Sequence, residues 1–335
     1  MTGIGSGAAP WLDRTHVGDC RHLLHRMADD GVRVQMCLTS PPYFGLRRYM
    51  PASHPDAHLE IGREETPQQY IAHLVEVFRA VRQILSDDGT LWIVIGDSYA
   101  ANLSAQAPST RGGPKHSAAQ GAAGRSRIGS GVKLKDMLGI PWALAFALRS
   151  DGWYLRQEVI WHKLNPMPES VTDRCTRAHE HVFLLSKRPR YHFDHAAIRE
   201  PSADPRGPGN VRPVRQPPDE RGSGANANLR GSLHKILARA LRNRRDVWSI
   251  ASQPFKGSHF AVFPEQLVIP CILAGSRPGD TVLDPFMGSG TTAAVALRLQ
   301  RHFIGCELNQ SFIDLQHLHG RASAQGFPPT TEVSP

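Results

Sequence analysis

Two apolar runs near opposite ends of the chain are each followed at once by residues that end a strand. The first run spans Val32–Leu38 and precedes Pro41-Pro42, a pair that neither a strand nor a helix continues through. The second run spans Thr281–Asp284 and precedes a turn that contains Gly288 and Gly290. Because open α/β sheets bind ligands beyond the carboxyl ends of their strands, both turns are expected at one such edge, side by side.

Further strands and helices are predicted between and after these runs. The spacing from Thr66-Pro67 to Leu85 predicts a helix that ends at Asp87–Gly89. The remaining predicted elements are a strand at Thr90–Ile95, a helix at Lys135–Arg149, strands at Tyr154–Trp161 and His181–Leu185, a helix at Pro264–Leu273, a helix at Thr291–Leu299 and a strand at His302–Glu307. This alternation predicts a three-layer α/β fold with a largely parallel sheet.

Composition divides the chain into a catalytic domain in two parts and an insertion. The first part is expected at 11–194, with a mobile loop at about 100–131 that lacks apolar periodicity, and the second at 246–325. Residues 195–245 are rich in Pro, Gly, Asn and Arg. From Pro201 to Arg245 there are ten Lys and Arg against three acids. This segment is predicted to be a target-recognition region, with a disordered surface insertion as the alternative.

Length and charge limit the classes of protein. At 335 residues the chain is long enough to bury the core of an enzyme. It has no run near the ~20 apolar residues of a membrane span, and Met1–Pro10 does not resemble a signal peptide, so a cytoplasmic protein is expected. The net charge of +9 favours a polyanionic partner. Five scattered cysteines indicate neither a disulfide framework nor a zinc site.

The late turn is predicted to hold a cofactor. Its glycines allow the backbone to turn tightly and to approach a ligand closely, although a plain tight turn explains Gly288–Thr292 equally well. Glu307 ends the next strand 23 residues after Asp284, near the separation at which an acid accepts hydrogen bonds from ribose hydroxyls. A carboxylate in the turn repels phosphate and attracts a sulfonium, which favours S-adenosylmethionine over NAD or ATP. No Lys precedes the Thr pair, so a P-loop fits poorly.

The early turn is predicted to hold an aromatic amine. The nitrogen of a nucleobase amine is a poor nucleophile because its lone pair is delocalised into the ring. Ser40 Oγ and the carbonyl of Pro41 are placed to accept its two N–H bonds, which localises the lone pair. Pro42 stiffens the turn and Tyr43 offers a ring for stacking. An amine inside a duplex is out of reach, so the base must be flipped out before the methyl group is transferred in line.

At these residues the chain resembles the DNA amino-methyltransferases, which methylate cytosine N4 or adenine N6 and carry a D/N/S-P-P-Y/F/W motif. The order of segments is similar to that of the beta group of this family: the Ser40–Tyr43 motif first, then Thr90–Asp97, Trp161–Pro166, Ala178–Lys187, a variable region, His259–Leu267 and the Asp284 turn. The resemblance covers nearly everything except Met1–Pro10, 100–131 and 201–245. It implies a Rossmann-like S-adenosylmethionine-dependent methyltransferase fold in permuted motif order.

The resemblance also implies site residues and partners. Ser40, Pro41, Pro42 and Tyr43 are expected to be catalytic. The expected cofactor-binding residues are Asp19, Thr39, Phe260, Pro264, Asp284, Pro285, Phe286, Gly288, Gly290, Thr291 and Glu307. Asp19 equally fits a helix cap. The expected substrate is double-stranded DNA in a prokaryotic or phage-infected cell, near the nucleoid. The resemblance further implies a homodimer and a cognate restriction endonuclease that acts on the same site as partners to test.

Ser rather than Asp before Pro-Pro looks more like the cytosine-N4 enzymes, so cytosine N4 is the expected target and adenine N6 the alternative. A DNA-binding regulator without catalysis is disfavoured because both motifs are intact. Contacts to DNA phosphates are expected from Arg47, Arg48, Arg242, Arg244 and Arg245, with solvated surface as the alternative. Cys271 lies in an apolar helical pattern and is expected to be a buried thiol, and His179 and His181 lack a third metal ligand.

Overall fold

The computed structural model describes residues 9–46, 48–51, 53–100, 132–202, 241–252, 263–314 and 316. Contacts divide the chain into two compact units, one formed by Met1–Phe193 with Asp246–Pro335 and the other by Asp194–Arg245. In the smaller unit, β6 (Glu200–Pro201) pairs antiparallel with β7 (Leu241–Arg242). The larger unit carries the main sheet and both turns that were singled out from the sequence.

The main sheet has the strand order β1-β10-β9-β2-β3-β5-β4-β8 within the described part of the chain. Its strands are β1 (Arg14–Val17), β2 (Val34–Thr39), β3 (Leu85–Ile95), β4 (Tyr154–His162), β5 (His179–Ser186), β8 (Val247–Ser249), β9 (Thr281–Asp284) and β10 (His302–Glu307). Strand β5 runs antiparallel to both β3 and β4, and the other neighbouring pairs are parallel. The predicted largely parallel sheet is confirmed.

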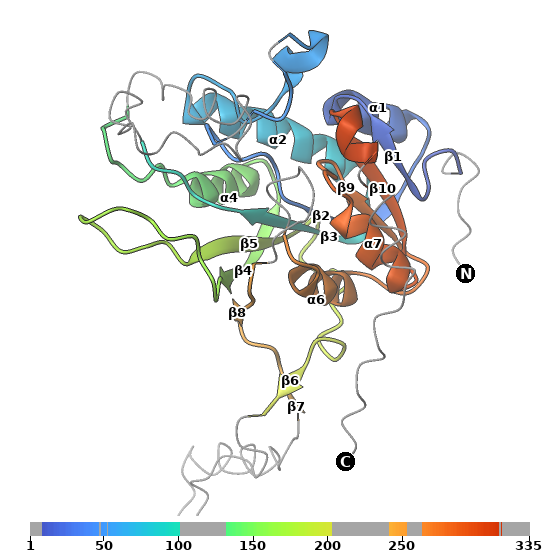
Figure 1. Ribbon diagram of the computed structural model, residues 1–335. Helices are drawn as coiled ribbons and strands as arrows, with labels where there is room; N and C mark the ends of the chain where they lie inside the picture. Colours follow the sequence, from blue (N-terminus) through green and yellow to red (C-terminus); the bar gives the residue numbers. More distant parts are fainter. Residues whose placement is uncertain are drawn as a thin grey trace, which may run out of the picture. The chain divides into compact units, whose positions relative to one another are not determined.

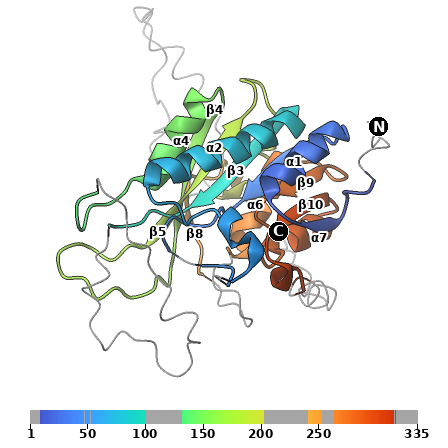
Figure 2. The same cartoon turned by 90° about the horizontal axis from the view of Figure 1, so that it is seen from above.

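Helices cover both faces of this sheet (Figure 1). They are α1 (Cys20–Asp29), α2 (Pro67–Ile84), α4 (Ile140–Ser150), α6 (Glu265–Gly275) and α7 (Thr291–Arg298). One face carries α1, α2 and α4, which follow one another across the sheet when it is seen from above (Figure 2). The opposite face carries α6 and α7. The three predicted layers are therefore present.

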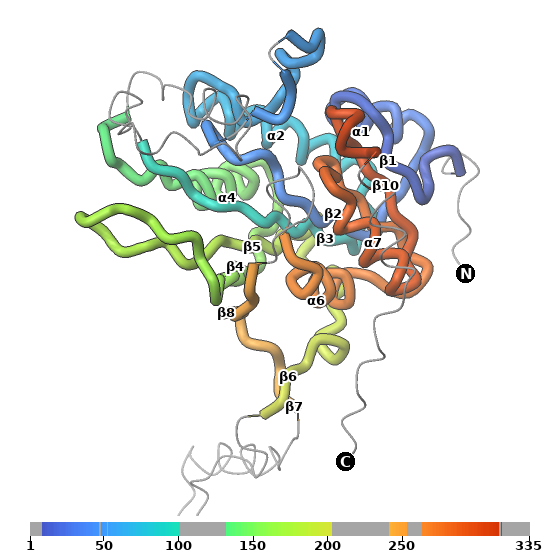
Figure 3. Tube along the Cα trace, in the orientation of Figure 1, coloured from blue at the N-terminus to red at the C-terminus, as the bar shows by residue number. Residues whose placement is uncertain are grey.

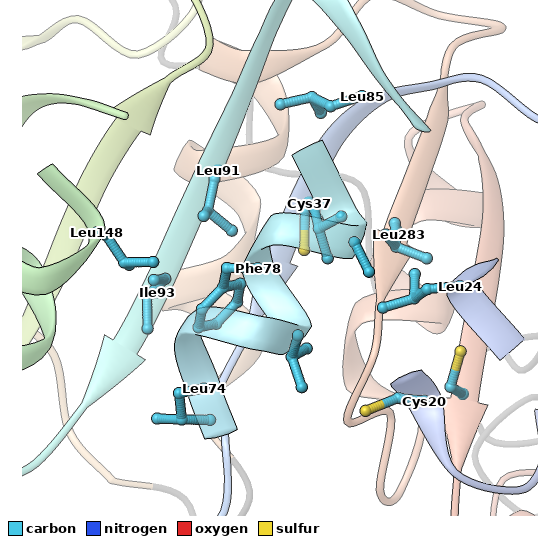
Figure 4. Packing of buried hydrophobic residues seen from close by; sticks show 14 of the residues in the cluster. Cys20, Leu24, Cys37, Leu74, Phe78, Leu85, Leu91, Ile93, Leu148 and Leu283 are labelled. Carbon is cyan, nitrogen blue, oxygen red and sulfur yellow. The ribbon is translucent and has the colours of Figure 1, made fainter. Parts of the chain in front are cut away.

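The central strands are rich in buried residues because both faces of the sheet are covered. All six residues of β2 are buried. On one face Cys37 and its neighbours in the sheet pack against the helical side chains Leu24 and Phe78 (Figure 4). On the other face Gly275 of α6 lies so close that a Cβ atom there would stand 2.9 Å from Thr90 Oγ1 and 3.1 Å from the Met36 side chain. Only a glycine lets this helix approach the sheet so closely.

The order of the strands places the two ends of the chain side by side. Strands β9 and β10, from the C-terminal part, lie between β1 and β2, from the N-terminal part (Figure 3). From β9 the chain continues through α7 to β10 on one side, whereas from β2 it continues through α2 to β3 on the other. The direction of winding therefore reverses between β9 and β2. In such a sheet the crevice beyond the carboxyl ends of these two strands is where ligands bind.

Two predicted boundaries were wrong. The helix expected at Lys135–Arg149 begins only at Ile140, because Lys135 and Gly139 adopt positive φ angles of 70° and 68°. The N–H groups of Gly139 and Ile140 instead donate to the carboxylate of Asp97, at 3.0 Å each. Asp87–Gly89 does not separate α2 from a strand, because β3 starts at Leu85 and accommodates these residues in a register shift opposite β2.

Three further observations concern the described residues. None of their helices has the length and apolar character that crossing a bilayer requires. Cys20, Cys37, Cys271 and Cys306 are buried and Cys175 is exposed. Cys271 Sγ lies 3.3 Å from the carbonyl oxygen of Leu267 in α6, as expected of a structural thiol.

Candidate active site

The two turns meet through a buried hydrogen bond. Strand β2 ends at Thr39 and strand β9 ends at Asp284, and Thr39 Oγ1 donates to Asp284 Oδ1 at 2.6 Å. Thr292 Oγ1 donates to the other carboxylate oxygen at 2.7 Å, and the N–H of Phe286 donates to Oδ1 at 3.0 Å. Residues far apart in the sequence therefore share one anchor.

Asp284 is internal to the structure, which differs from the expectation that its carboxylate faces the cofactor. Only 1% of Asp284 is exposed, and it is not among the residues that line the pocket described below. Burial raises its pKa to about 6, although hydrogen bonds from Thr39 and Thr292 act in the opposite direction. With its oxygens taken up by these donors, Asp284 holds the turn in shape, and its electrostatic role toward a cofactor is indirect.

A pocket of about 850 Å³ lies beyond the ends of β2 and β9. One part of its wall is formed by Ser40–Tyr43 and another by Pro285–Ser289 together with Thr291 and Glu307. The rest comes mainly from the start of α1, from the segment before α2, from the residues just after β3, and from the end of β4 through to the start of β5. The lining residues of these segments include Asp19, Tyr49, Met50, Glu60, Gly96, Asp97, Trp161, Lys163, Asn165, Met167, Arg177, His179 and Glu180.

Ten of the predicted site residues line this pocket. They are Asp19, Ser40, Pro41, Pro42, Tyr43, Pro285, Phe286, Gly288, Thr291 and Glu307. Thr39, Asp284, Gly290 and Pro264 do not line it: Thr39 and Asp284 are joined by a buried hydrogen bond, and Gly290 and Pro264 are the N-caps of α7 and α6. Arg48 is exposed and lies beside the lining residue Tyr49. Phe260 and Arg47 fall outside the described residues.

The glycine turn depends on left-handed backbone at two positions. Gly288 and Gly290 have φ angles of 52° and 86°, which side chains with a Cβ atom rarely adopt. Gln316 Nε2 donates to the carbonyl of Gly288 at 2.6 Å, while Thr15 Oγ1 donates to Gln316 Oε1 at 2.6 Å. The turn is therefore held from outside by β1 and by the end of the described chain.

Thr291 carries an unsatisfied polar atom at the pocket wall. Thr291 lines the pocket and is only 5% exposed. Its Oγ1 is buried and has no hydrogen-bond partner. A buried hydroxyl without a partner costs free energy unless a ligand or water satisfies it. Thr291 therefore places a hydroxyl without a partner next to the pocket wall.

Glu307 presents a carboxylate at the end of β10. Its Oε2 accepts the N–H of Gly288 and its Oε1 accepts the N–H of Asn309, both at 2.8 Å. Burial raises its pKa to about 7, and the charge of Asp284 adds to this increase. Near neutral pH Glu307 is therefore partly protonated, and its ionised form can accept hydrogen bonds from hydroxyl groups in the pocket.

Asp19 satisfies one of the two predicted alternatives. It is the N-cap of α1, where its Oδ1 accepts the N–H of Arg21 at 2.9 Å, and it also forms an ion pair with the Arg21 side chain. It lines the pocket as well, so contact with an adenine amino group remains a prediction.

The Ser40–Tyr43 turn is held by residues that the sequence motifs did not single out. Tyr70 of α2 is completely buried and donates its hydroxyl to the carbonyl of Pro42 at 2.7 Å. Tyr43 donates its hydroxyl to Glu180 Oε2 at 2.6 Å, and Lys163 donates to the other oxygen of Glu180. Burial raises the pKa of Tyr43 well above its usual value, and the charge of Glu180 adds to this effect. Tyr43 therefore stays protonated as the donor.

Sequence patterns gave only partial signals for these supporting residues. Lys163 and Glu180 lie in segments that carried the family resemblance, but nothing in the chain suggested that they meet Tyr43. Tyr70 is one of several buried residues on the apolar face of α2, and nothing in the sequence distinguishes it from the others. The rings of His179 and His181 contact each other edge to face, and His181 Nδ1 lies 2.5 Å from Glu158 Oε1. Across the described residues, no group of three or more His, Cys, Asp and Glu is arranged to hold a metal ion.

Comparison with known proteins identifies the family. A family model described as DNA methylase, of the N6/N4 methyltransferase type, matches residues 34–317. The chain belongs to this DNA methylase family. It is 41% identical over 299 residues to the type II methyltransferase M.Cfr9I of Citrobacter freundii, covering 89% of this chain and 84% of the relative. It is 42% identical to the type II methyltransferase M.SmaI of Serratia marcescens, covering 89% and 87%.

Solved structures share the fold of this DNA methylase. The cytosine-N4-specific PvuII DNA methyltransferase aligns with a TM-score of 0.57 and 17% identity, covering 98% of this chain and 93% of that one. M1.HpyAVI, solved as a complex with SAM, aligns with a TM-score of 0.52 and 15% identity, covering 93% and 99%. The predicted methyltransferase architecture and the resemblance to DNA amino-methyltransferases of restriction-modification systems are thus confirmed.

The raised pKa of Glu307 predicts a pH-dependent stability. Because its pKa rises from 4.5 to about 7 on folding, the folded protein binds more protons than the unfolded chain between these values. This contribution to stability is present at low pH and is lost as the pH rises through the window. Glu307→Gln removes it. Urea unfolding should show the stability of wild type falling relative to Glu307→Gln as the pH rises from 5 to 7.

Glu76→Gln is the matched control, since it removes an exposed carboxylate from α2. Its pH dependence should follow that of wild type. Parallel curves for wild type and Glu307→Gln would show that burial of Glu307 does not shift its pKa on folding.

Proposed function

We propose that this DNA methylase transfers a methyl group from S-adenosylmethionine to the exocyclic N4 amine of cytosine in double-stranded DNA. The observation that carries the proposal is the bond from Thr39 to Asp284, which brings the Ser40–Tyr43 turn and the glycine turn to one pocket. The methyl donor and the amine that accepts the methyl group then both have a place within a single cavity.

The cofactor side of the pocket fits a nucleoside with a charged sulfur. Glu307 accepts hydrogen bonds from ribose hydroxyls, the unsatisfied Thr291 hydroxyl takes a polar group, and Phe286 offers an apolar surface. Asp19 lies where it can accept from an adenine amino group. When bound, S-adenosylmethionine supplies a methyl group on a sulfonium. The protein contributes binding, orientation and exclusion of water.

The amine side of the pocket prepares the nucleophile. Ser40 Oγ and the Pro41 carbonyl accept the two N–H bonds of the target amine, which favours a pyramidal nitrogen with a localised lone pair. The Pro42 carbonyl is held by Tyr70, so the turn cannot rotate these acceptors away. The ring of Tyr43 stacks on the extruded base. Catalysis then rests mainly on positioning, without a covalent enzyme intermediate.

The choice of cytosine over adenine rests on Ser40. A neutral acceptor at this position is more similar to the cytosine-N4 enzymes of the family, and PvuII methyltransferase, which shares the fold, is named as cytosine-N4-specific. Adenine N6 is the alternative within the same mechanism. A regulator without catalysis is disfavoured because the residues of both turns line one pocket.

The modified base can be identified directly. DNA from cells that express the chain should contain N4-methylcytosine when it is digested to nucleosides and analysed by mass spectrometry. DNA from cells that carry an empty vector is the control. Finding N6-methyladenine as the sole new nucleoside would replace cytosine with adenine as the target and leave the rest of the mechanism intact.

Removal of the acceptor should separate catalysis from cofactor binding. Ser40→Ala is expected to lower turnover by on the order of 100-fold, because it deletes a preorganised hydrogen-bond acceptor at the reacting amine. The affinity for S-adenosylmethionine should change little. Turnover of labelled methyl groups and calorimetric binding measure the two effects. Ser150→Ala, at the exposed end of α4, is the control, and unchanged turnover in Ser40→Ala would remove Ser40 from the mechanism.

Residues 195–245 are proposed to form the target-recognition region, with Arg48 contacting phosphates beside the pocket. In this region Arg242 and Arg245 both donate to Glu200 Oε1, at 2.9 and 2.8 Å. A homodimer and a cognate restriction endonuclease are further expectations from the family.

Neutralising charges at this cluster tests the DNA contact. Replacing Arg242, Arg244 and Arg245 together by Ala should weaken DNA binding and flatten its dependence on salt, since fewer counterions are released. Glu200→Gln is the opposite change, because it removes the carboxylate that Arg242 and Arg245 share. It should strengthen binding. DNA affinity measured across a salt series reports both variants, and equal affinities for wild type and the triple variant would move the contact elsewhere.

A further inference from the structure

A series of side-chain contacts begins at Tyr43 and extends from the Ser40–Tyr43 turn to neighbouring strands. Its hydroxyl donates to Glu180 Oε2 at 2.6 Å, and Lys163 donates to Glu180 Oε1. The Lys163 ammonium also lies 4.7 Å from the centre of the Trp161 ring, as in a cation–π contact. All four residues line the pocket. These contacts therefore link the Ser40–Tyr43 turn to β4 and β5.

The position of the Tyr43 ring is restricted further by Gly96. A Cβ atom at Gly96 would lie 2.8 Å from Tyr43 Cε2 and 3.3 Å from Glu180 Cγ. The backbone at the end of β3 thus packs directly against both side chains. Contact at Gly96 and the hydrogen bond at the hydroxyl together restrain the ring at two separate points.

We propose that Glu180, held by Lys163, is a positioning residue that fixes the Tyr43 ring in the orientation that receives the extruded base. This inference rests on the stacking role proposed for Tyr43. A ring needs no hydroxyl to stack, so the phenol hydroxyl serves to tether the ring to the protein. A preoriented ring avoids the loss of rotational freedom when the base enters, and that loss otherwise raises the barrier.

The charge of Glu180 explains why Lys163 is part of the same arrangement. Glu180 is mostly buried, with 13% of its side chain exposed, and Lys163 has 23% exposed. A carboxylate of this kind without a partner is costly, and an ionised acceptor makes the bond from Tyr43 stronger than a neutral one. Lys163 therefore compensates the charge of Glu180, and the paired carboxylate holds Tyr43.

A purely structural role is the competing explanation. In the sheet Trp161 pairs with Glu180, so the bond from Lys163 to Glu180 also joins β4 to β5. If joining the strands were its function, loss of Glu180 would lower stability and would act independently of the Tyr43 hydroxyl. The two explanations therefore differ in how mutations at Glu180 and Tyr43 combine.

A double-mutant cycle with full-length protein tests the inference. Glu180→Leu should lower kcat by about 10- to 100-fold, as expected for a misplaced reacting group, with S-adenosylmethionine affinity unchanged within about twofold. Glu180→Gln should recover part of kcat, because its amide oxygen can accept from Tyr43. In a Tyr43→Phe background, Glu180→Leu should change kcat by no more than about twofold. Independent, multiplicative effects of the two substitutions would overturn the proposal.

Glu158→Leu is the matched control, because Glu158 contacts His181 across the same two strands and neither residue lines the pocket. It should alter thermal stability and leave kcat close to that of wild type. Tyr43→Ala separates this inference from the proposed function. If Tyr43→Ala keeps full turnover, the stacking role itself fails. If Tyr43→Ala loses turnover and Glu180→Leu does not, only the positioning role of Glu180 is wrong.

Discussion

The hydrogen bond from Thr39 to Asp284 is the contact on which the active site depends. It joins the ends of two neighbouring parallel strands at the point where the winding of the sheet reverses. Asp284 also accepts hydrogen bonds from the Thr292 hydroxyl at the start of α7 and from the N–H of Phe286 in the turn. One carboxylate therefore fixes the strand, the turn and the helix that follows. Burying this carboxylate is costly, as its raised pKa shows, and the three donors offset that cost.

The two walls of the pocket are supported by different parts of the fold. The wall formed by Ser40–Tyr43 is held from α2 by Tyr70 and from β5 by Glu180. The wall formed by Pro285–Ser289 is held by Gln316, by Thr15 and by the pairing of β9 with β10. Because the supports are separate, a substitution behind one wall can change its function while the other wall keeps its geometry. This separation makes a split between turnover and cofactor affinity measurable.

The strands and the site motifs could be predicted from the sequence because local rules determine them. β9 and β10 match the prediction in full, since short apolar runs with clear ends have few alternatives. The start of α4 could not be predicted, because it depends on positive φ angles and on Asp97 at the end of another strand. Likewise the pocket-lining motifs were identified, whereas the inward role of Asp284 and the contacts of Tyr43 with Glu180 depend on residues far away in the chain.

The distribution of charge within the pocket follows from these supports. On the amine side Glu180 is compensated by Lys163, so this wall adds little net field around a neutral base. On the cofactor side Glu307 accepts from the backbone N–H groups of Gly288 and Asn309, and burial together with Asp284 raises its pKa to about 7. A cationic ligand with hydroxyl groups favours the ionised form of Glu307, so binding such a ligand near neutral pH is coupled to release of a proton. Glu307 thus presents its carboxylate to the pocket beside the glycine turn, a position that the sequence alone had assigned to Asp284.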